Sequence, residues 1–350
     1  MKRPTQCLTI VCLIWACNTI SAQDRGWASS IAWSPDGQTI AVGSDSGIWF
    51  FDNDFNEVGH VDIKQQADSR KPRFVAWNAS GDLLVYSGIT IDSVKVVDVS
   101  KLEVIAEIDA SRLWLWVPVV WHPTKNLIIG GTFGGEAHMW DAITGEERFF
   151  FDHRAEDPVL EWFEPVGFCW FTDDTVVIVL QDRGYVVNIV ENRIVRKLYI
   201  NLPPGPASCN RDYQIITKDG RLTDLQTGSS MRVFDYDKYA VAVEWSPDSS
   251  HFIVSSAHCR LRVFDGQTYE VVAELVGGGY WVRLEAVPIA WHPDGSRFAV
   301  VGEFGDVRVW DAKTYELMQR FDGFELHPNL LGRLEDQDLP TVRSCPQLKI

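Results

Sequence analysis

The sequence predicts an all-β fold, a seven-bladed β-propeller of four-stranded antiparallel blades, and three observations indicate it. Six tryptophans each end a short apolar run and precede a polar turn, with successive gaps of 44, 44, 49, 75 and 46 residues. A later strand-like run ends in an apolar residue followed by Asp, 19 to 21 residues after the tryptophan in five of the units. A four-stranded unit of this size cannot bury both apolar faces alone, so we expect seven units to stack in a closed ring.

Each unit is expected to contain four strands joined by tight turns, in which Pro and Gly supply the special backbone dihedrals. The residues that define the repeat are Trp33, Trp77, Trp121, Trp170, Trp245, Trp291, Asp52, Asp98, Asp141, Asp265 and Asp311. The stretch "IAWSPDGQTIA" at residues 31–41 returns at residues 289–299 as "IAWHPDGSRFA". We expect these two segments to begin neighbouring blades, the first and the last of the ring.

The first part of the chain has a different composition from the rest. Residues 1–22 comprise a short cationic segment, the apolar run "CLTIVCLIWAC" and small residues that end at Ala22, a pattern typical of a signal peptide. The run is too short for a typical transmembrane helix, and no later segment approaches 18 uninterrupted apolar residues. We therefore expect a secreted or periplasmic protein without a transmembrane segment, cleaved near Ala22. The alternative is a lipid anchor at Cys17, although Trp15 fits a lipobox poorly.

The propeller itself is expected over residues 23–322, followed by a C-terminal tail over 323–350. Blade four is expected to close at Glu191. Blade five, at about residues 201–238, is degenerate because it has lost its turn tryptophan. The run "YELMQRFD", residues 315–322, is expected to supply the outer strand of blade seven, and the tail is expected to strap the closure of the ring.

Two repeats end in Trp-Asp, at Trp140–Asp141 and Trp310–Asp311, and others end in Phe-Asp or Val-Asp. These endings resemble the WD40 family, and the resemblance covers essentially all of the chain from residue 23 to about residue 322. The turn "WSPDG" is shared with TolB-like propellers, the second choice, whereas the Asp-terminated third strand favours WD40. Most repeats lack the Gly-His pair of the family, so its internal hydrogen-bond network is expected to be incomplete here.

The net charge limits the class of partner, and the cysteine content bears on the redox compartment. The net charge is −16, and removal of residues 1–22 leaves 30 basic and 48 acidic residues, a net charge of −18. This argues against nucleic acid and anionic membranes, which require Lys and Arg to neutralise phosphates. Four cysteines remain, and an oxidising compartment permits any of their three full pairings. We favour Cys169 with Cys209, because both fall near the start of neighbouring repeats, and Cys259 with Cys345, which would pin the tail. Buried free thiols are the open alternative.

The search for catalytic and metal motifs is mostly negative, and no cofactor is expected. The chain has no CxxC, HExxH, P-loop or nucleophile-elbow pattern. Residues 52–56, "DNDFN", begin like a calcium loop but lack its later Gly and Glu, so a turn between strands is expected. His122 and His292 recur at one repeat position and are interpreted as structural turn residues. Asn78 in "NAS" is either an N-glycosylation acceptor or a turn residue.

Three long aromatic segments lead into inner strands, at residues 112–118, 159–165 and 280–288. In a propeller such connections emerge on one face, around the mouth of the axial channel. The candidate ligand-binding residues are Arg112, Trp114, Trp116, Trp162, Phe163, Tyr280, Trp281 and Arg283. Aromatic residues combined with Arg are typical of protein-binding hot spots. The alternative is that some of these rings pack between blades.

The preferred hypothesis is a non-enzymatic scaffold that binds a protein or peptide through this channel-mouth face, because loops vary while a rigid ring holds them. The inner strands offer few polar residues apart from Arg73, Asn210 and Glu244, which disfavours a catalytic site in the channel. The alternative is a hydrolase or lyase acting on a carbohydrate or lactone, with the loop carboxylates Glu161, Glu164 and Glu285. A third hypothesis is a structural module of a larger envelope assembly.

Overall fold

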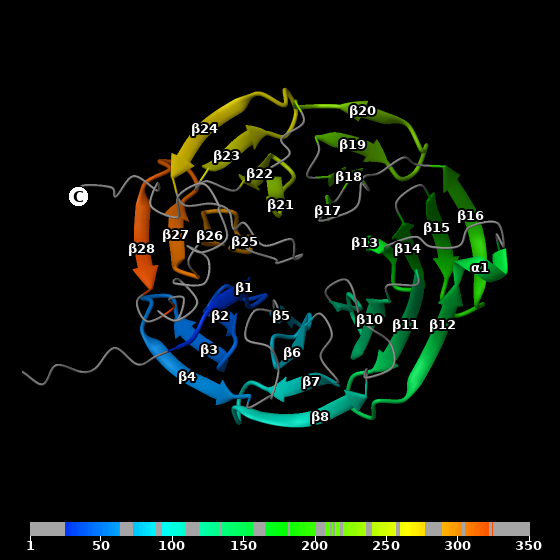
Figure 1. Ribbon diagram of the computed structural model, residues 1–350, viewed down its shortest axis with the longest axis horizontal. Helices are drawn as coiled ribbons and strands as arrows, with labels where there is room; N and C mark the ends of the chain where they lie inside the picture. The colour runs from blue at the N-terminus through cyan, green and yellow to red at the C-terminus, as the bar shows by residue number, and fades with distance from the viewer. Residues whose placement is uncertain are drawn as a thin grey trace, which may run out of the picture.

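The computed structural model describes residues 25–63, 73–88, 93–109, 119–132, 135–156, 165–180, 183–199, 207–210, 212, 214–217, 220–235, 240–256, 260–276, 289–302, 305–321 and 324. These residues form seven sheets of four strands each, and the strand order within every sheet follows the chain. All neighbouring strands within a sheet are antiparallel. The sheets are arranged as blades around a central axis (Figure 1). The predicted seven-bladed β-propeller is therefore confirmed.

The strands of the first four blades have the following bounds. Blade one contains β1 (Ala28–Trp33), β2 (Thr39–Ser44), β3 (Gly47–Asp52) and β4 (Glu57–Asp62). Blade two contains β5 (Arg73–Trp77), β6 (Leu83–Gly88), β7 (Ser93–Asp98) and β8 (Glu103–Asp109). Blade three contains β9 (Val120–Trp121), β10 (Leu127–Gly131), β11 (Glu136–Asp141) and β12 (Glu147–Asp152), followed by the short helix α1 (His153–Glu156). Blade four contains β13 (Pro165–Thr172), β14 (Thr175–Leu180), β15 (Arg183–Asn188) and β16 (Arg193–Tyr199).

The last three blades repeat this arrangement. Blade five contains β17 (Ala207–Cys209), β18 (Gln214–Thr217), β19 (Arg221–Asp224) and β20 (Ser230–Arg232). Blade six contains β21 (Ala240–Trp245), β22 (His251–Ser256), β23 (Arg260–Asp265) and β24 (Val271–Val276). Blade seven contains β25 (Ile289–Trp291), β26 (Arg297–Val301), β27 (Val307–Asp311) and β28 (Leu317–Phe321). The second, third and fourth strands of blade five are shorter than the corresponding strands of every other blade, in agreement with its degenerate sequence.

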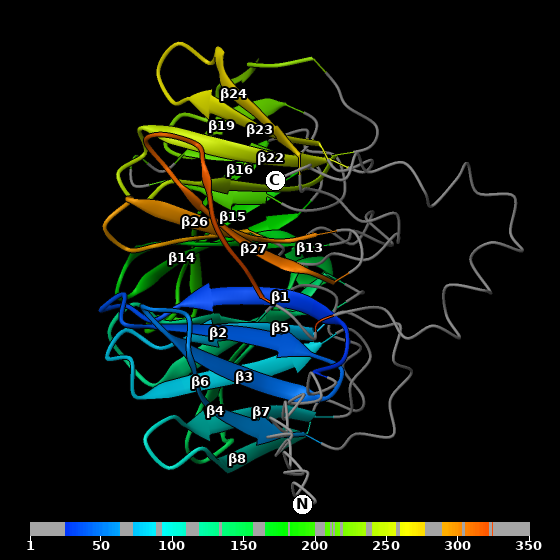
Figure 2. The same cartoon turned by 90° about the vertical axis from the view of Figure 1, so that its left-hand side faces the viewer.

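The antiparallel order gives the ring two distinct faces, which are seen edge-on in Figure 2. The first and third strands of a blade run in one direction, and the second and fourth run in the other. Every connection from an outer strand to the next inner strand therefore leaves on the same side, here called the loop face. The tight turns after the first and third strands lie on the opposite side, here called the turn face.

Apolar side chains fill the space between neighbouring blades. At the junction of blades one and seven, Ile31 and Val42 pack with Val307 and Val309. The inner strand β1 contacts β5 on one side and β25 on the other. The expectation that residues 31–41 and 289–299 belong to neighbouring blades is therefore correct, and the ring is closed by burial of apolar surface.

Repeated tryptophans and histidines hydrogen-bond to a neighbouring blade at four of the junctions. Trp121 Nε1 donates a hydrogen bond to the carbonyl oxygen of Ala76, at 2.8 Å, on the inner strand of the preceding blade. In blade seven, His292 Nε2 donates to the carbonyl oxygen of Gly37 at 3.0 Å, in the first turn of blade one. His122 Nε2 makes the equivalent bond to Asp173 of the following blade. The structural role predicted for the two histidines is confirmed.

An Asp side chain caps the turn between the third and fourth strands of most blades. In blade seven, Asp311 Oδ1 accepts the backbone N–H groups of Lys313 and Thr314, at 2.9 and 2.7 Å. These hydrogen bonds hold the pKa of the Asp311 carboxyl below its ordinary value. Asp52 accepts backbone N–H groups in the same way, so "DNDFN" is a turn between strands, as expected.

The structure corrects the predicted end of the fourth repeat. Asn188, not Glu191, occupies the capping position of blade four, because Asn188 Oδ1 accepts the N–H groups of Val190 and Glu191. Glu191 lies inside the turn. Blade five has a cap that the repeat spacing did not predict, Asp224, whose carboxylate accepts two backbone N–H groups of its own turn.

A disulfide bond joins blades four and five. Cys169 on β13 is bonded to Cys209 on β17, where Cys209 stands at the position that a tryptophan occupies in the other blades. The predicted Cys169–Cys209 pair is therefore confirmed, and the free-thiol alternative is wrong for these two residues. Cys259 and Cys345 lie outside the described residues, so their pairing stays a prediction.

Both ends of the propeller meet where blade one contacts blade seven, here called the seam. Blade seven is complete by itself because β28 pairs with β27, as the sequence predicted. Phe324 is fully buried and packs with Trp49 and Phe51 of blade one. The guanidinium of Arg25 lies 5.4 Å from the ring centroids of the same two residues. The role predicted for the tail, apart from Phe324, falls on residues outside the described part of the chain.

No helix among the described residues is long and apolar enough to cross a membrane. The segment interpreted as a signal peptide lies outside those residues, as does Cys17, so both assignments stay predictions.

Candidate functional site

The residues predicted to bind a ligand belong to segments that the structure does not describe, and only the stems of those segments are placed. The candidate ligand-binding residues outside the described part of the chain are Arg112, Trp114, Trp116, Trp162, Phe163, Tyr280, Trp281 and Arg283. The carboxylates of the alternative enzyme hypothesis, Glu161, Glu164 and Glu285, also lie outside it. Each segment follows an outer strand or its helical extension, and each precedes the inner strand of the next blade. All three stems therefore emerge on the loop face.

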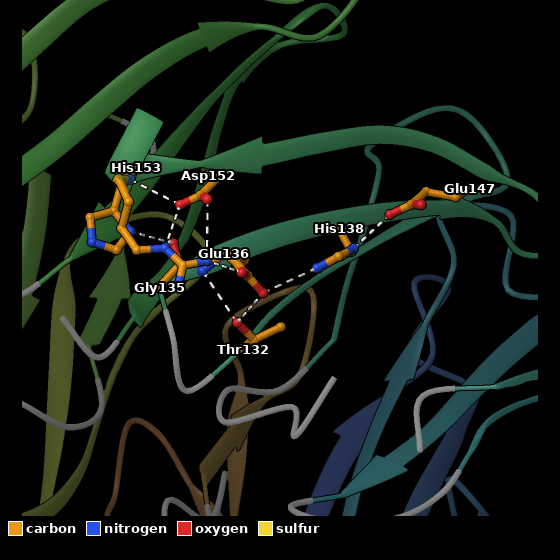
Figure 3. Close-up of polar contacts among 8 residues, drawn as sticks. Thr132, Gly135, Glu136, His138, Glu147, Asp152 and His153 are labelled. Atoms are coloured by element: carbon orange, nitrogen blue, oxygen red, sulfur yellow. Dashed lines mark hydrogen bonds and ion pairs between the residues drawn. The ribbon is translucent and has the colours of Figure 1, made fainter. Parts of the chain in front are cut away.

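The stem that leads from blade three toward Trp162 is anchored by a group of charged residues, here called the stem cluster (Figure 3). Its members are Thr132, Glu136, His138, Glu147, Asp152 and Arg154. Arg154 of α1 forms ion pairs with Glu136 at the start of β11 and with Asp152 at the end of β12. Thr132 Oγ1 donates to Glu136 at 3.2 Å. These contacts fix α1 to two strands of blade three.

The charges of the stem cluster stabilise one another. Burial alone would raise the pKa of Asp152, but the hydrogen bonds from Arg154 outweigh it and hold that pKa below the ordinary value. The hydrogen bond to Asp152 in turn raises the pKa of Arg154. Both groups therefore remain ionised at neutral pH and keep α1 in place. The arrangement suits anchoring rather than proton transfer.

His138 lies between two carboxylates of this cluster. The residue is only 7% exposed, and its side chain packs beside the rings of Trp140 and Phe150. Nδ1 lies 2.6 Å from Glu147 Oε1, and Nε2 lies 3.8 Å from Glu136 Oε2. A neutral imidazole has one N–H, which Nδ1 donates to Glu147, and Nε2 then has no hydrogen-bond partner.

The stem that leads from blade six toward Tyr280 and Trp281 is held by an arginine of blade seven. Arg308 Nη1 donates to the carbonyl oxygen of Val276, the last residue of β24, at 3.0 Å. Arg308 Nε donates to the buried carboxylate of Asp306 at 2.6 Å, which fixes the guanidinium. Arginine–carboxylate pairs therefore anchor the stems of two aromatic segments.

Glu244 is the one acid at its repeat position in the inner strands. The seven residues at this position are Ala32, Ala76, Val120, Cys169, Ser208, Glu244 and Ala290. Protein atoms surround Glu244 although its side chain is still partly exposed near the axis. Burial raises the pKa of Glu244 to about 7, while a hydrogen bond with Ser208 acts in the opposite direction. In the described part of the chain, no group of three His, Cys, Asp or Glu residues is placed to hold a metal.

Asn78 is a turn residue, and its contacts favour this structural role over glycosylation. Its side chain is 2% exposed. Nδ2, the atom that would carry a glycan, donates to Asp82 Oδ1 at 2.7 Å. Oδ1 accepts the backbone N–H of Leu83 at 3.0 Å. Addition of a sugar would require the turn to open.

The ring of seven complete blades, with its long connections on one face, defines the class of protein as a β-propeller with a loop-bearing face. The WD40 family model (WD domain, G-beta repeat) matches residues 16–52 and 228–265. Both matches end at a repeat-closing aspartate, Asp52 and Asp265. Two of the repeats are therefore similar to WD40 repeats, in a ring of seven four-stranded blades. No curated protein is a significant match to the chain.

Proposed function

We propose that this β-propeller with WD40-like repeats is a non-enzymatic scaffold that acts outside the cytoplasm and binds a protein or peptide on its loop face. The proposal is carried by the observation that the stems of the three aromatic segments all emerge on one face of the ring. WD40 propellers commonly serve as protein-interaction scaffolds. Six aromatic residues and two arginines in these segments match the composition of interaction hot spots.

Two features support a location outside the cytoplasm. Residues 1–22 have the composition of a signal peptide. The Cys169–Cys209 bond is of a kind that persists in oxidising compartments and is rare in the cytosol of most organisms.

The charge pairing at the stems supports a binding role rather than catalysis. Arg154 and Arg308 are each held by a carboxylate, so their charges fix the stems of two segments in place. A binding face benefits from such preorganisation because less conformational entropy is lost when the partner binds.

The test is affinity capture with residues 23–350 as bait, from the extracellular or envelope fraction of the source cells. The expected result is a specific partner that the Trp114→Ala/Trp281→Ala variant fails to capture. The matched control is Ile143→Ala, because Ile143 is an apolar residue, 45% exposed, in the turn between β11 and β12 on the turn face, opposite the loop face. Capture of identical material by all three proteins would contradict the proposed face.

A further inference from the structure

The junction between blades four and five lacks the tryptophan that packs into each of the other six junctions. In those junctions a tryptophan near the end of an inner strand packs into the apolar cluster between its own blade and the preceding one. These residues are Trp33, Trp77, Trp121, Trp170, Trp245 and Trp291. Cys209 occupies this position in blade five, so a small side chain stands where the other blades have a large ring.

A second apolar contact, nearer the circumference, is also absent from this junction in the described part of the chain. In four blades, a turn residue with positive φ packs against the cluster shared with the preceding blade. These residues are Phe55, Leu102, Tyr269 and Tyr315. Blade five has Gly228 there, and no atom lies within 4 Å of the Cβ that a larger residue would add. Blades three and four have Gly145 and Asn192 but keep their tryptophans.

A disulfide and an arginine hold blade five to blade four instead. The Cys169–Cys209 bond joins the inner strands β13 and β17, which lie beside the axis (Figure 1). Farther out, Arg196 of β16 donates to the backbone carbonyl groups of Leu225 and Gln226. The cluster between these blades has the fewest buried side chains of the seven. Among the described residues of blade five, those fully buried in it are Ile215 and Leu225.

Blade five has little stability of its own to replace these contacts. β17 has three residues and β18 has four, so few backbone hydrogen bonds must break for the two strands to separate. Segments with few hydrogen bonds and little buried apolar surface open locally at low cost in free energy. The disulfide is therefore the strongest restraint that the structure shows on the inner strand of blade five.

We propose that the junction between blades four and five is a redox-controlled opening of the ring. The Cys169–Cys209 bond keeps it closed, and a dithiol reductant opens it by allowing β17 and β18 to separate from blade four. The opening lies within the ring and does not depend on the proposed function of the loop face.

The reduction follows ordinary thiol–disulfide exchange. Cys209 is partly exposed whereas Cys169 is 4% exposed, so a thiolate of the dithiol attacks Sγ of Cys209. The bond between the two cysteines breaks, and Cys169 leaves as a thiolate and takes up a proton. The second thiol of the reductant then displaces Cys209, which also takes up a proton. The dithiol becomes a disulfide, so it loses the two electrons that the cysteines gain.

Hydrogen exchange of the folded protein with and without dithiothreitol tests the proposal. We expect reduction to accelerate exchange of the backbone amides of β17 and β18 at least about tenfold. Exchange in β1 and β25, at the seam, is expected to change less than about twofold. Equal exchange of β17 and β18 in the two conditions, or an acceleration shared equally by all blades, would overturn the proposal.

Two double variants separate the loss of this bond from other effects of the reductant. Cys169→Ser/Cys209→Ser is expected to show the fast exchange of β17 and β18 without dithiothreitol and no further response to it. Cys169→Ala/Cys209→Trp restores the alanine and tryptophan found between blades one and two, at Ala32 and Trp77. We expect it to exchange slowly in both conditions. A response to dithiothreitol that persists in the serine variant, or fast exchange of the tryptophan variant, would contradict the proposed role of the bond.

Discussion

Glu244 is an acidic residue at a position where six of the seven blades have an uncharged side chain. Its surroundings favour the protonated form, and its pKa is raised to about 7 from an ordinary value of 4.5. Between these two pH values the unfolded chain has released the proton while the folded protein still holds it. The unfolded state then binds fewer protons, so stability is lost as the pH rises from 4.5 to 7.

Replacement of Glu244 by Gln removes this pH dependence, because the amide has a similar shape and no charge. We expect Glu244→Gln to raise the free energy of unfolding by about 1 to 3 kcal/mol at pH 8 and by much less at pH 5. Urea unfolding at the two pH values measures the difference. An equal effect at both pH values would show that ionisation of Glu244 does not oppose folding.

At the scale of single elements, the turn between the third and fourth strands depends on one carboxylate or amide oxygen. Asp311→Ala removes the acceptor of two backbone N–H groups and is expected to lower the free energy of unfolding by about 1 kcal/mol. Asp311→Asn keeps the oxygen, as Asn188 does naturally in blade four, and is expected to cost less than half as much. The midpoint of urea unfolding distinguishes the two variants, provided that the m-value is unchanged.

These turns also show why the blade count was predictable from the sequence while some details were not. The Trp-to-Asp spacing is local, so it survives in the five repeats that retain both residues. The end of blade four does not follow the Asp pattern, because Asn188 supplies the same oxygen without a charge. Blade five was obscured because Cys209 occupies the tryptophan position.

The stem cluster was not predicted, for a different physical reason. Glu136 and Arg154 are 18 residues apart and resemble ordinary surface charges when the sequence is inspected. They meet only because β11 and β12 pair and α1 folds back over their ends. The Trp, Phe and Tyr content of the three segments is enough to identify them in the sequence. The contacts that anchor their stems arise only in the tertiary fold.

At the scale of the whole molecule, the described residues close the ring without exchange of a strand between its two ends. Every outer strand pairs with a third strand of its own blade, so side chains must hold blade one against blade seven. Phe324 and Arg25 reach this seam from opposite ends of the propeller sequence, and both contact Trp49 and Phe51. The seam therefore depends on residues beyond the four-stranded repeats.

Phe324→Ala is expected to lower the free energy of unfolding by about 3 to 4 kcal/mol, because it opens a cavity in a fully buried contact. Hydrogen exchange is expected to accelerate most in β1 and β28. The control Phe150→Ala truncates a half-exposed ring of the same size and is expected to cost less than about 1 kcal/mol. Similar losses for the two variants, or exchange that accelerates equally in all blades, would contradict a role for Phe324 in closure.

The Cys169–Cys209 bond lies across the ring from the seam, between blades four and five (Figure 1). A protease that severs the backbone once anywhere between the two cysteines leaves the amino-terminal and carboxyl-terminal fragments covalently tethered. Separation of the fragments then requires a reductant or a further cut outside this loop. The nicked molecule thus remains a single particle in the oxidising surroundings where such bonds persist.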